Sequence, residues 1–199
     1  MKNEEKLFAS TCKFIAGASA IDQIPGNFEI SECAFVGKSN VGKSSLINSI
    51  TGMNCARVSK QPGRTQQINF FSLADKIVLV DLPGYGYAAV SKQMRVEWDQ
   101  LILHYLKNRK NLKRVYLLID SRRGIKDNDN QVMEILDSFG ISYQIVLTKA
   151  DKIENQNQLL NDITNELKNH AAAFPKVIIT SSKSKEGIQE LRQSIYEFC

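Results

Sequence analysis

An eight-residue stretch in the first quarter of the chain constrains the fold more than any other part of the sequence. In order, its residues are Gly37, Lys38, Ser39, Asn40, Val41, Gly42, Lys43 and Ser44. They match the pattern G-x-x-x-x-G-K-[ST], whose glycines let successive backbone N–H groups point inward as an anion nest. The apolar run before it, residues 32–36, suits a buried strand, and residues 45–50 after it read as the start of a helix. Strand, loop and helix together predict a phosphate-binding site, and the four fixed positions with these flanks argue against a chance match.

Further residues of this site follow from the chemistry of a bound nucleotide. Lys43 is expected to reach the β- and γ-phosphates, and the Ser44 hydroxyl to bind Mg²⁺. Asp81 ends the continuously apolar run 77–80, which places a carboxylate at the carboxyl end of a buried strand, beside the phosphate loop, where Mg²⁺ needs an outer ligand. Gly84 follows, and its backbone N–H can approach a γ-phosphate closely.

A second motif, Thr148-Lys149-Ala150-Asp151, ends another apolar strand, residues 142–147. An aspartate carboxylate accepts hydrogen bonds from the ring N–H and the exocyclic amino group of guanine, whereas adenine offers the opposite pattern. The Lys149 stem can lie along the plane of the base. The small loop 181–183, after the last predicted strand, can present a backbone N–H to guanine O6. Behind a phosphate loop, these elements indicate a guanine nucleotide.

The order of the predicted elements gives the fold class. Strands and helices alternate along the chain, and only residues 66–73 and 76–81 are joined closely enough to form an antiparallel hairpin. We therefore predict an α/β, three-layer P-loop GTPase domain over residues 31–199. Its sheet is expected to be mostly parallel and six-stranded, with one antiparallel edge strand and helices on both faces. Residues 1–30 are expected to be a lead-in segment packed on the domain.

Composition bears on partners and location. The net charge is +5 and the pI is near 9.0, which favours a nucleic-acid or ribosomal partner, although a non-specific basic surface gives the same numbers. No apolar run approaches the ~20 residues of a membrane span. The N-terminus lacks an apolar signal core, and the four scattered cysteines form no zinc pattern, so we expect a cytoplasmic protein with reduced thiols. The candidate RNA contacts are Arg57, Lys60, Arg64, Arg122 and Arg123.

Three stretches resemble one family closely: residues 37–48, the segment Pro62-Gly63-Arg64-Thr65-Gln66, and the segment from Asp81 to Ala88, which reads D-L-P-G-Y-G-Y-A. The chain resembles the EngB, YihA or YsxC family of bacterial GTPases, within the TrmE-Era-EngA-EngB-septin-like superfamily. The resemblance implies a cytoplasmic enzyme that converts GTP to GDP and phosphate and assists assembly of the large ribosomal subunit or its precursor. It also implies a need for the protein in normal cell division and septation. We expect a monomer.

The resemblance also implies site roles. Thr65 is the switch threonine that joins Ser44 and Asp81 around Mg²⁺ in the GTP state, and Lys43, Thr65 and Gly84 act in catalysis. The residues expected to bind the nucleotide are Gly37, Lys38, Ser39, Asn40, Val41, Gly42, Lys43, Ser44, Ser45, Gly63, Arg64, Thr65, Asp81, Leu82, Pro83, Gly84, Thr148, Lys149, Asp151, Ser181, Ser182 and Lys183.

Two positions depart from Ras-like enzymes. Tyr85 follows Gly84, where those enzymes place a glutamine that orients the attacking water, so we expect slow intrinsic hydrolysis or help from another source. Asn40 stands in the phosphate loop, where related GTPases use an asparagine to hold K⁺ against the phosphates. The alternative is that Asn40 only keeps the shape of the loop.

Two other functions remain open at this level. The protein could be a binding module whose nucleotide only sets its shape, with hydrolysis incidental; stimulation of turnover by large ribosomal subunits separates the two cases. A metabolic ATP-dependent kinase is the other, and Thr148-Lys149-Ala150-Asp151 and the lack of a recognisable acceptor-substrate domain argue against it.

Overall fold

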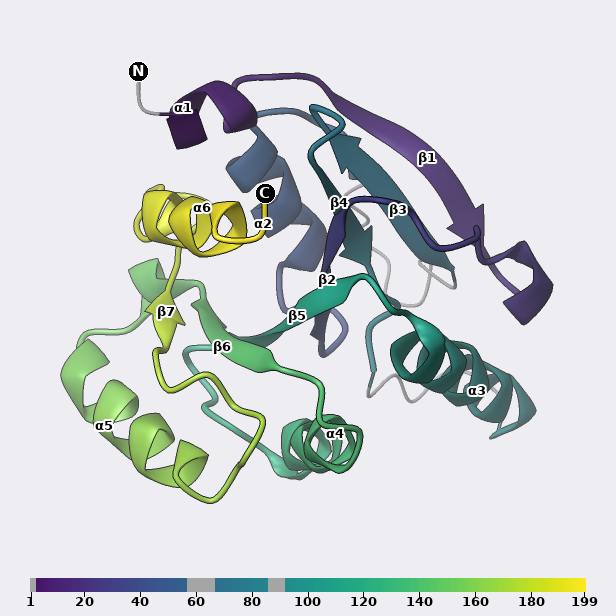
Figure 1. Cartoon of the computed structure of the whole chain (residues 1–199). Helices are drawn as coiled ribbons and strands as arrows, with labels where there is room; N and C mark the ends of the chain where they lie inside the picture. Colours follow the sequence, from purple (N-terminus) through teal and green to yellow (C-terminus); the bar gives the residue numbers. More distant parts are fainter. Residues whose placement is uncertain (1–2, 57–66, 86–91) are drawn as a thin grey trace.

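The computed structural model of the chain describes residues 3–56, 67–85 and 92–199, with residues 92–99 described by their backbone alone. One mixed sheet forms the centre of the molecule, in the order β1-β3-β4-β2-β5-β6-β7 (Figure 1). The strands are β1 (Cys12–Ala18), β2 (Ser31–Gly37), β3 (Ile68–Leu73), β4 (Ile77–Asp81), β5 (Leu112–Asp120), β6 (Tyr143–Thr148) and β7 (Ile178–Ile179). The helices are α1 (Asn3–Phe8), α2 (Lys43–Thr51), α3 (Lys92–Asn108), α4 (Asp127–Ser138), α5 (Gln156–Leu167) and α6 (Ile188–Tyr196), with short 3-10 turns at Ile21–Gln23 and Ala150–Lys152.

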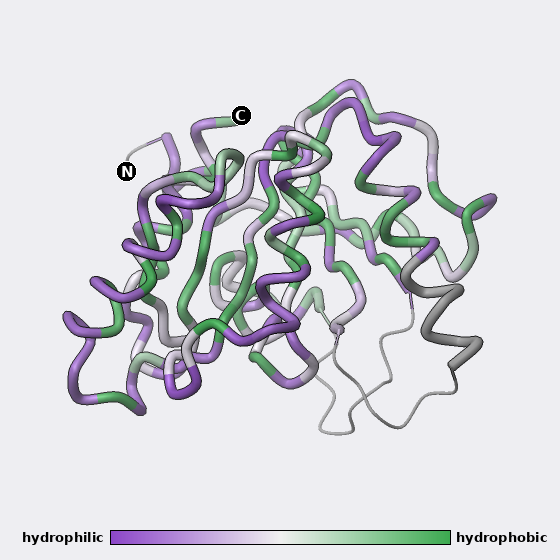
Figure 2. The backbone as a smooth tube through the Cα atoms, turned by 90° about the horizontal axis from the view of Figure 1, so that it is seen from below, coloured by the Kyte–Doolittle hydropathy of each residue, from purple (hydrophilic) through white to green (hydrophobic). Residues whose placement is uncertain are grey.

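Both faces of the sheet are covered, and this explains why its central strands are apolar without interruption. Alternate residues of β2 point to opposite sides: Cys33 and Phe35 pack with α1, α2 and α6, whereas Ala34 and Val36 pack with α3, α4 and α5. Figure 2 shows the result, with hydrophobic residues along the strands and hydrophilic ones along the outer helices. The three-layer α/β fold predicted from the sequence is confirmed.

The sheet has seven strands in the described residues, and the prediction of six was wrong. The additional strand is β1, which pairs antiparallel with β3, from Cys12 opposite Leu73 to Ala18 opposite Ile68. Because β1 covers β3, the one strand that runs against all the others is second from the edge and not at the edge. The strand β1 could not be recognised from the sequence, because it leaves apolar residues exposed to solvent and so lacks the alternation of apolar and polar residues that marks a half-buried strand. Phe14 is 58% exposed and Ile15 is 39% exposed.

The predicted hairpin is confirmed. β3 and β4 are antiparallel, and the two central residues of the turn that joins them, Ala74 and Asp75, have φ of 53° and 52°. Positive φ at both central positions matches the right-handed twist of the strands, and Ser72 Oγ donates to Asp75 Oδ1 at 2.8 Å. The remaining predicted elements are present with shifted bounds; β7, for example, covers Ile178–Ile179 and not residues 176–180. No helix among the described residues is long and apolar enough to cross a membrane.

Candidate functional site

The phosphate loop connects the end of β2 to the start of α2. Gly37 is the last residue of the strand, and α2 begins at Lys43, so the N–H groups of the first helical turn open onto the loop. Two residues in the loop have left-handed backbones, Asn40 with φ 65° and Gly42 with φ 106°. The loop also closes on itself, since the Val41 N–H donates to the Lys38 carbonyl at 3.0 Å. This is the strand–nest–helix arrangement that binds phosphate.

Gly37 has no room for a side chain, and Gly84 has very little. A Cβ on Gly37 would lie 2.8 Å from the Leu118 carbonyl oxygen on β5. A Cβ on Gly84 would lie 3.2 Å from both the Gly37 carbonyl oxygen and the Ser39 nitrogen. The segment after β4 therefore lies directly against the phosphate loop, and glycine is what permits that approach.

Asp81 and Lys43 meet beside the loop. Asp81 lies opposite Phe35 in the parallel pairing of β4 with β2, two residues before the phosphate loop begins. Its Oδ1 accepts a hydrogen bond from Lys43 Nζ, in an ion pair whose side chains are only 3% and 9% exposed. The Leu82 N–H then donates to the Phe35 carbonyl at 3.0 Å and continues the chain past the loop toward Pro83 and Gly84. The predicted adjacency of Asp81 to the phosphate loop is thus a feature of the fold.

Tyr85 fastens the end of this segment at two points. Its backbone pairs with the phosphate loop, since its N–H donates to the Gly37 carbonyl (3.3 Å) and its carbonyl accepts from the Ser39 N–H (3.1 Å). Its hydroxyl donates to Asp129 Oδ1 in the first turn of α4, where Asp129 Oδ2 also accepts from the Lys126 N–H at 2.9 Å. Burial and the neighbouring Asp129 carboxylate hold the pKa of Tyr85 well above its usual range, so the phenol stays protonated.

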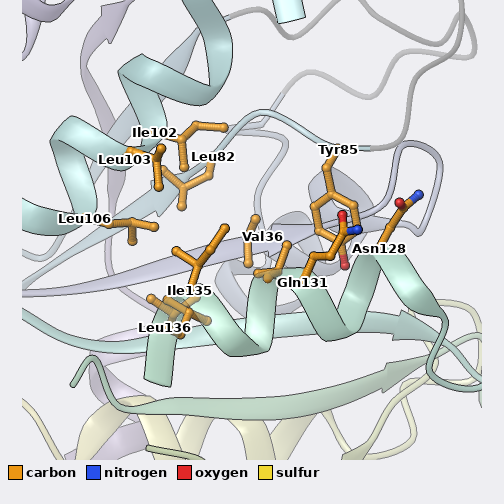
Figure 3. A pocket seen from close by; sticks show the side chains of 12 residues that line it. Val36, Leu82, Tyr85, Ile102, Leu103, Leu106, Asn128, Gln131, Ile135 and Leu136 are labelled. Atoms are coloured by element: carbon orange, nitrogen blue, oxygen red, sulfur yellow. The ribbon is translucent and has the colours of Figure 1, made fainter. Parts of the chain in front are cut away.

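The Tyr85 ring borders an apolar cavity of about 310 Å³ between α3 and α4 (Figure 3). Leu82 and Val36 belong to its lining on the sheet side, Ile102 and Leu106 on the α3 side. The phenol points toward α4 (Figure 3), where its hydroxyl meets Asp129. The position that carries a water-orienting glutamine in Ras-like enzymes is used here for a contact between helix and loop.

Replacing Tyr85 with phenylalanine separates a structural role of the hydroxyl from a role in the reaction. Loss of a hydrogen bond to a partly buried carboxylate should lower the free energy of unfolding by about 1–2 kcal/mol. Because the hydroxyl faces Asp129, GTP turnover should stay within about twofold of the wild type. Urea unfolding and single-turnover hydrolysis measure the two quantities, with Tyr196→Phe on α6 as the matched control. A large loss of turnover at unchanged stability would show that the phenol takes part in the reaction.

The Thr148–Asp151 element is tied to the phosphate loop from the other side. Thr148 Oγ1 donates to the Val41 carbonyl at 2.8 Å. Lys149 has a left-handed backbone (φ 61°), and its Nζ donates to the Asn40 carbonyl and to Asp120 Oδ2, both at 2.8 Å. Two motifs more than a hundred residues apart thus form one surface.

Asp120 is a site residue that the sequence reasoning missed. It is the last residue of β5, and it receives Lys149 Nζ at 2.8 Å and Arg122 Nη2 at 2.6 Å. Partial burial works against its ionisation, but the hydrogen bonds from Arg122 and Lys149 outweigh that and hold the pKa of Asp120 well below its usual range. The available signal was a carboxylate at the carboxyl end of a buried strand, the same signal that identified Asp81.

Asp151 is held from the loop after β7. Ser181, which is fully buried, donates its hydroxyl to Asp151 Oδ1 at 2.6 Å. The Ser181 Oγ in turn accepts from the N–H groups of Lys183 (3.2 Å) and Ser184 (3.1 Å). The hydrogen bond from Ser181 lowers the pKa of Asp151, so its carboxylate is an ionised acceptor with one oxygen already oriented.

Other predicted residues gather around these. A cavity of about 550 Å³ brings Ser45 of α2 beside Ser182 and Lys183. A second cavity, of about 250 Å³, lies against the phosphate loop and is lined by basic side chains together with Asp120 and Asp129. These basic residues are Lys38, Arg122, Arg123, Lys126 and Lys149.

Part of the predicted site falls outside the described residues. It comprises Gly63, Arg64 and Thr65, and the basic residues Arg57 and Lys60.

Comparison with known proteins agrees with this geometry. Residues 32–149 match the family model described as "50S ribosome-binding GTPase". A protein of Rickettsia akari named "Probable GTP-binding protein EngB" is 53% identical over 193 residues, which cover 96% of this chain and 89% of that protein. One of the same name from Rhodospirillum rubrum is 48% identical over 197 residues, covering 95% and 85%.

Solved structures resemble most of the fold. The crystal structure of a probable GTP-binding protein engB is 26% identical, with a TM-score of 0.69, over 84% of this chain and 98% of the other. Era of Aquifex aeolicus, crystallised with GDP and AlF4−, also gives a TM-score of 0.69 at 21% identity, over 86% of this chain and 57% of Era. At that identity the likeness to Era concerns the fold alone.

Proposed function

The chain belongs to the EngB family of GTP-binding proteins and is a GTPase, and on this basis we propose that it is a Mg²⁺-dependent GTP/GDP switch acting on the large ribosomal subunit or its precursor. The observation that carries the proposal is the joining of two motifs. Lys149, from the element suited to guanine, bonds to the Asn40 carbonyl of the phosphate loop. One molecule with guanine at one end and phosphates at the other spans that surface.

In this proposal the chain's own residues divide the work on GTP. The loop N–H groups and Lys43 hold the phosphates and neutralise charge that develops as the γ-phosphoryl group leaves. The Gly84 N–H approaches the γ-phosphate, since Gly84 already packs on the loop backbone. The Tyr85 hydroxyl is engaged by Asp129, so the attacking water is oriented by other means and intrinsic turnover is slow.

The donor set suits Mg²⁺. Ser44 lies in the first turn of α2, and the Asp81 carboxylate is almost fully buried at the end of β4 beside Lys43. Hydroxyl and carboxylate oxygens are the ligands that Mg²⁺ prefers. We propose that Ser44 binds the ion directly, that Asp81 holds it through water, and that Thr65 joins them in the GTP state. When bound, the ion would supply positive charge that offsets the negative charge of the phosphates.

Guanine selection rests on Asp151 and the loop that supports it. Ser181 occupies one lone pair of Asp151 Oδ1, which orients the carboxylate toward the edge of a base. In the same loop the Ser181 N–H donates to the Glu186 carbonyl and the Lys183 N–H donates to Ser181 Oγ. The intervening Ser182 N–H is therefore the amide that we assign to guanine O6.

The proposed ribosomal contact uses the basic cavity beside the phosphate loop. Arg123 and Lys126 lie on its rim next to Arg122, whose guanidinium also bonds Asp120. Contacts between such basic side chains and the phosphates of RNA weaken as the salt concentration rises, because binding releases counterions from the RNA. In keeping with the family resemblance, we place the protein in the cytoplasm as a monomer, with a link to cell division and septation.

Cosedimentation with large ribosomal subunits tests the proposal. Binding should be stronger with a non-hydrolysable GTP analogue than with GDP, and it should fall steeply as salt rises. Arg123→Ala should reduce the slope of log affinity against log salt by about one. Lys13→Ala, which removes one exposed charge on β1, is the control and should leave the slope unchanged. Salt-independent binding, or no increase in GTP turnover on adding subunits, would contradict a ribosome-coupled GTPase.

A potassium ion near Asn40 is a separate proposal. The Asn40 backbone already has a structural role, because its φ is positive and its carbonyl accepts from Lys149, while the side-chain amide oxygen suits K⁺. If the ion binds, hydrolysis at equal ionic strength should be faster in potassium than in sodium, and Asn40→Ala should abolish that difference. Equal rates in both salts would leave Asn40 with its structural role alone.

A further inference from the structure

One carboxylate lies where the phosphate loop meets the Thr148–Asp151 element. Asp120 is the last residue of β5 and is paired with Thr148 in the parallel register of β5 and β6. The next residue continues this pairing, since the Ser121 N–H donates to the Thr148 carbonyl at 3.0 Å. The backbone of the central sheet therefore fixes Asp120 beside the residue that follows Thr148, which is Lys149.

The Lys149 ammonium connects these two parts of the site. Its Nζ donates to Asp120 Oδ2 and to the Asn40 carbonyl, both at 2.8 Å. The Asp120 side chain is 10% exposed and the Lys149 side chain 26%, so the ion pair is partly shielded from solvent. The tip of the lysine is thus held by two elements, the phosphate loop and the central sheet.

We propose that Asp120 is a positioning residue for nucleotide binding, because it holds the Lys149 side chain in the conformation in which its stem lies along guanine. Asp120 would not touch the nucleotide and would act through the lysine alone. The inference rests on the guanine-binding role proposed for the Thr148–Asp151 element.

A lysine needs such support more than a shorter side chain does. Its four-carbon stem has many rotamers, and a base that packs on a mobile stem must first order it, which lowers affinity. The two acceptors differ in what carries them. The Asn40 carbonyl belongs to a loop, whereas Asp120 ends a strand that is paired with β2 on one side and β6 on the other. The bond to Asp120 therefore ties the stem to the most firmly held part of the fold.

Arg122 keeps the carboxylate of Asp120 in place. Its Nε donates to Asp120 Oδ1 at 2.8 Å and its Nη2 to Oδ2 at 2.6 Å, a two-pronged contact that fixes the plane of the carboxylate. The Arg122 N–H also donates to Oδ1, at 3.1 Å. Partial burial opposes ionisation, but the hydrogen bonds from Arg122 and Lys149 keep the pKa of Asp120 well below its usual range, so the acceptor stays charged at neutral pH.

The charge of Asp120 allows the proposal to be tested by the direction of an effect. A carboxylate near a polyanionic nucleotide repels it, so if charge alone mattered, removing Asp120 would tighten binding. If Asp120 acts by holding Lys149, its removal frees the stem and weakens binding, despite the gain in positive charge. The two explanations therefore predict opposite changes in affinity.

The affinities of Asp120→Ala for GDP and GTP measure that direction. Both should fall by about three- to tenfold, since ordering one long side chain costs roughly that much. The two factors should be equal, because the lysine stem is proposed to contact the base, which both nucleotides share. Asp127→Ala, which removes an exposed carboxylate at the start of α4, is the matched control and should bind as wild type does. Tighter or unchanged binding by Asp120→Ala, or a loss confined to GTP, would overturn the proposal.

A second variant shows whether the effect passes through the lysine. Lys149→Met keeps an unbranched apolar stem but has no ammonium to bond Asp120. Adding Asp120→Ala to that variant should cost little further affinity, so the two changes should be strongly non-additive. Additive losses would mean that Asp120 acts on the nucleotide by another route, and the positioning role would be wrong.

Two further measurements separate positioning from a role in stability alone. Removing Asp120 also removes a partner of Arg122, and urea unfolding reports any weakening of the fold that results. Under conditions where the variant is fully folded, a positioning role predicts faster dissociation of GDP. The hydrolysis rate of GTP once bound should change much less, because the contacts to the phosphates are kept. A wild-type dissociation rate in a folded but destabilised variant would leave Asp120 with a structural role and contradict the proposal.

Failure of the proposed function would have a different signature. If wild type bound ADP as tightly as GDP, the guanine assignment would be wrong, and with it the base contact of Lys149. If wild type selects GDP and Asp120→Ala keeps the full affinity, the proposal for Asp120 alone is wrong.

Discussion

Replacing Asp151 with asparagine should turn the protein from a GTP binder into a binder of xanthosine triphosphate. The ionised carboxylate accepts two hydrogen bonds from guanine, whereas an amide presents one acceptor and one donor. Xanthine carries an oxygen where guanine has the amino group, so the amide can donate to it. Affinity for GTP should fall by at least about 100-fold, because a site built to hydrogen-bond a group discriminates strongly when that match is lost.

Competition binding with GTP, ATP and xanthosine triphosphate measures this change. Wild type should prefer GTP, the variant should prefer xanthosine triphosphate, and ATP should bind poorly to both. Asp162→Asn, on α5, is the matched control and should retain the wild-type order. Ser181→Ala gives an intermediate case, since it leaves the carboxylate but removes the hydroxyl that orients it. Equal binding of ATP and GTP by wild type would disprove the guanine assignment.

Removing the Lys43 ammonium should have the largest effect on the reaction. In the proposed mechanism this group neutralises charge on the phosphates as the transition state forms, so Lys43→Ala should slow GTP hydrolysis by about 10²–10³-fold. The same change leaves the Asp81 carboxylate buried without its partner, which destabilises a fold by roughly 3–5 kcal/mol in comparable cases.

A second variant keeps these two effects apart. Lys43→Arg retains a positive charge beside Asp81, so the fold should be close to wild type in urea unfolding. Its planar guanidinium cannot replace a compact ammonium among the phosphates, so hydrolysis should still fall strongly. Lys76→Ala, at the turn between β3 and β4, is the control and should alter neither property. Wild-type turnover in Lys43→Arg would contradict the proposed role of the lysine.

The amino-acid sequence alone carried the phosphate loop, the position of Asp81 and the class of the fold. These are local properties, because the glycines let the loop curl and the helix that follows supplies N–H groups at its N-terminus. The segment therefore forms a phosphate-binding loop without help from distant residues. Parallel strands covered on both faces then bring their carboxyl ends to a single edge, so residues at those ends meet without any knowledge of coordinates. The hairpin of β3 and β4 was also predictable from local sequence, because the link between its two strands is too short for a parallel crossover.

Only the tertiary structure decided which partners these residues have. The bonds of Lys149 to Asn40 and Asp120, of Ser181 to Asp151 and of Tyr85 to Asp129 join positions 29 to 109 residues apart, and no local pattern encodes them. The strand β1 escaped prediction because its stability comes from pairing with β3 and not from a buried face of its own. Local preference determined the elements and the motif, and the packing of distant segments determined the environment of each functional side chain.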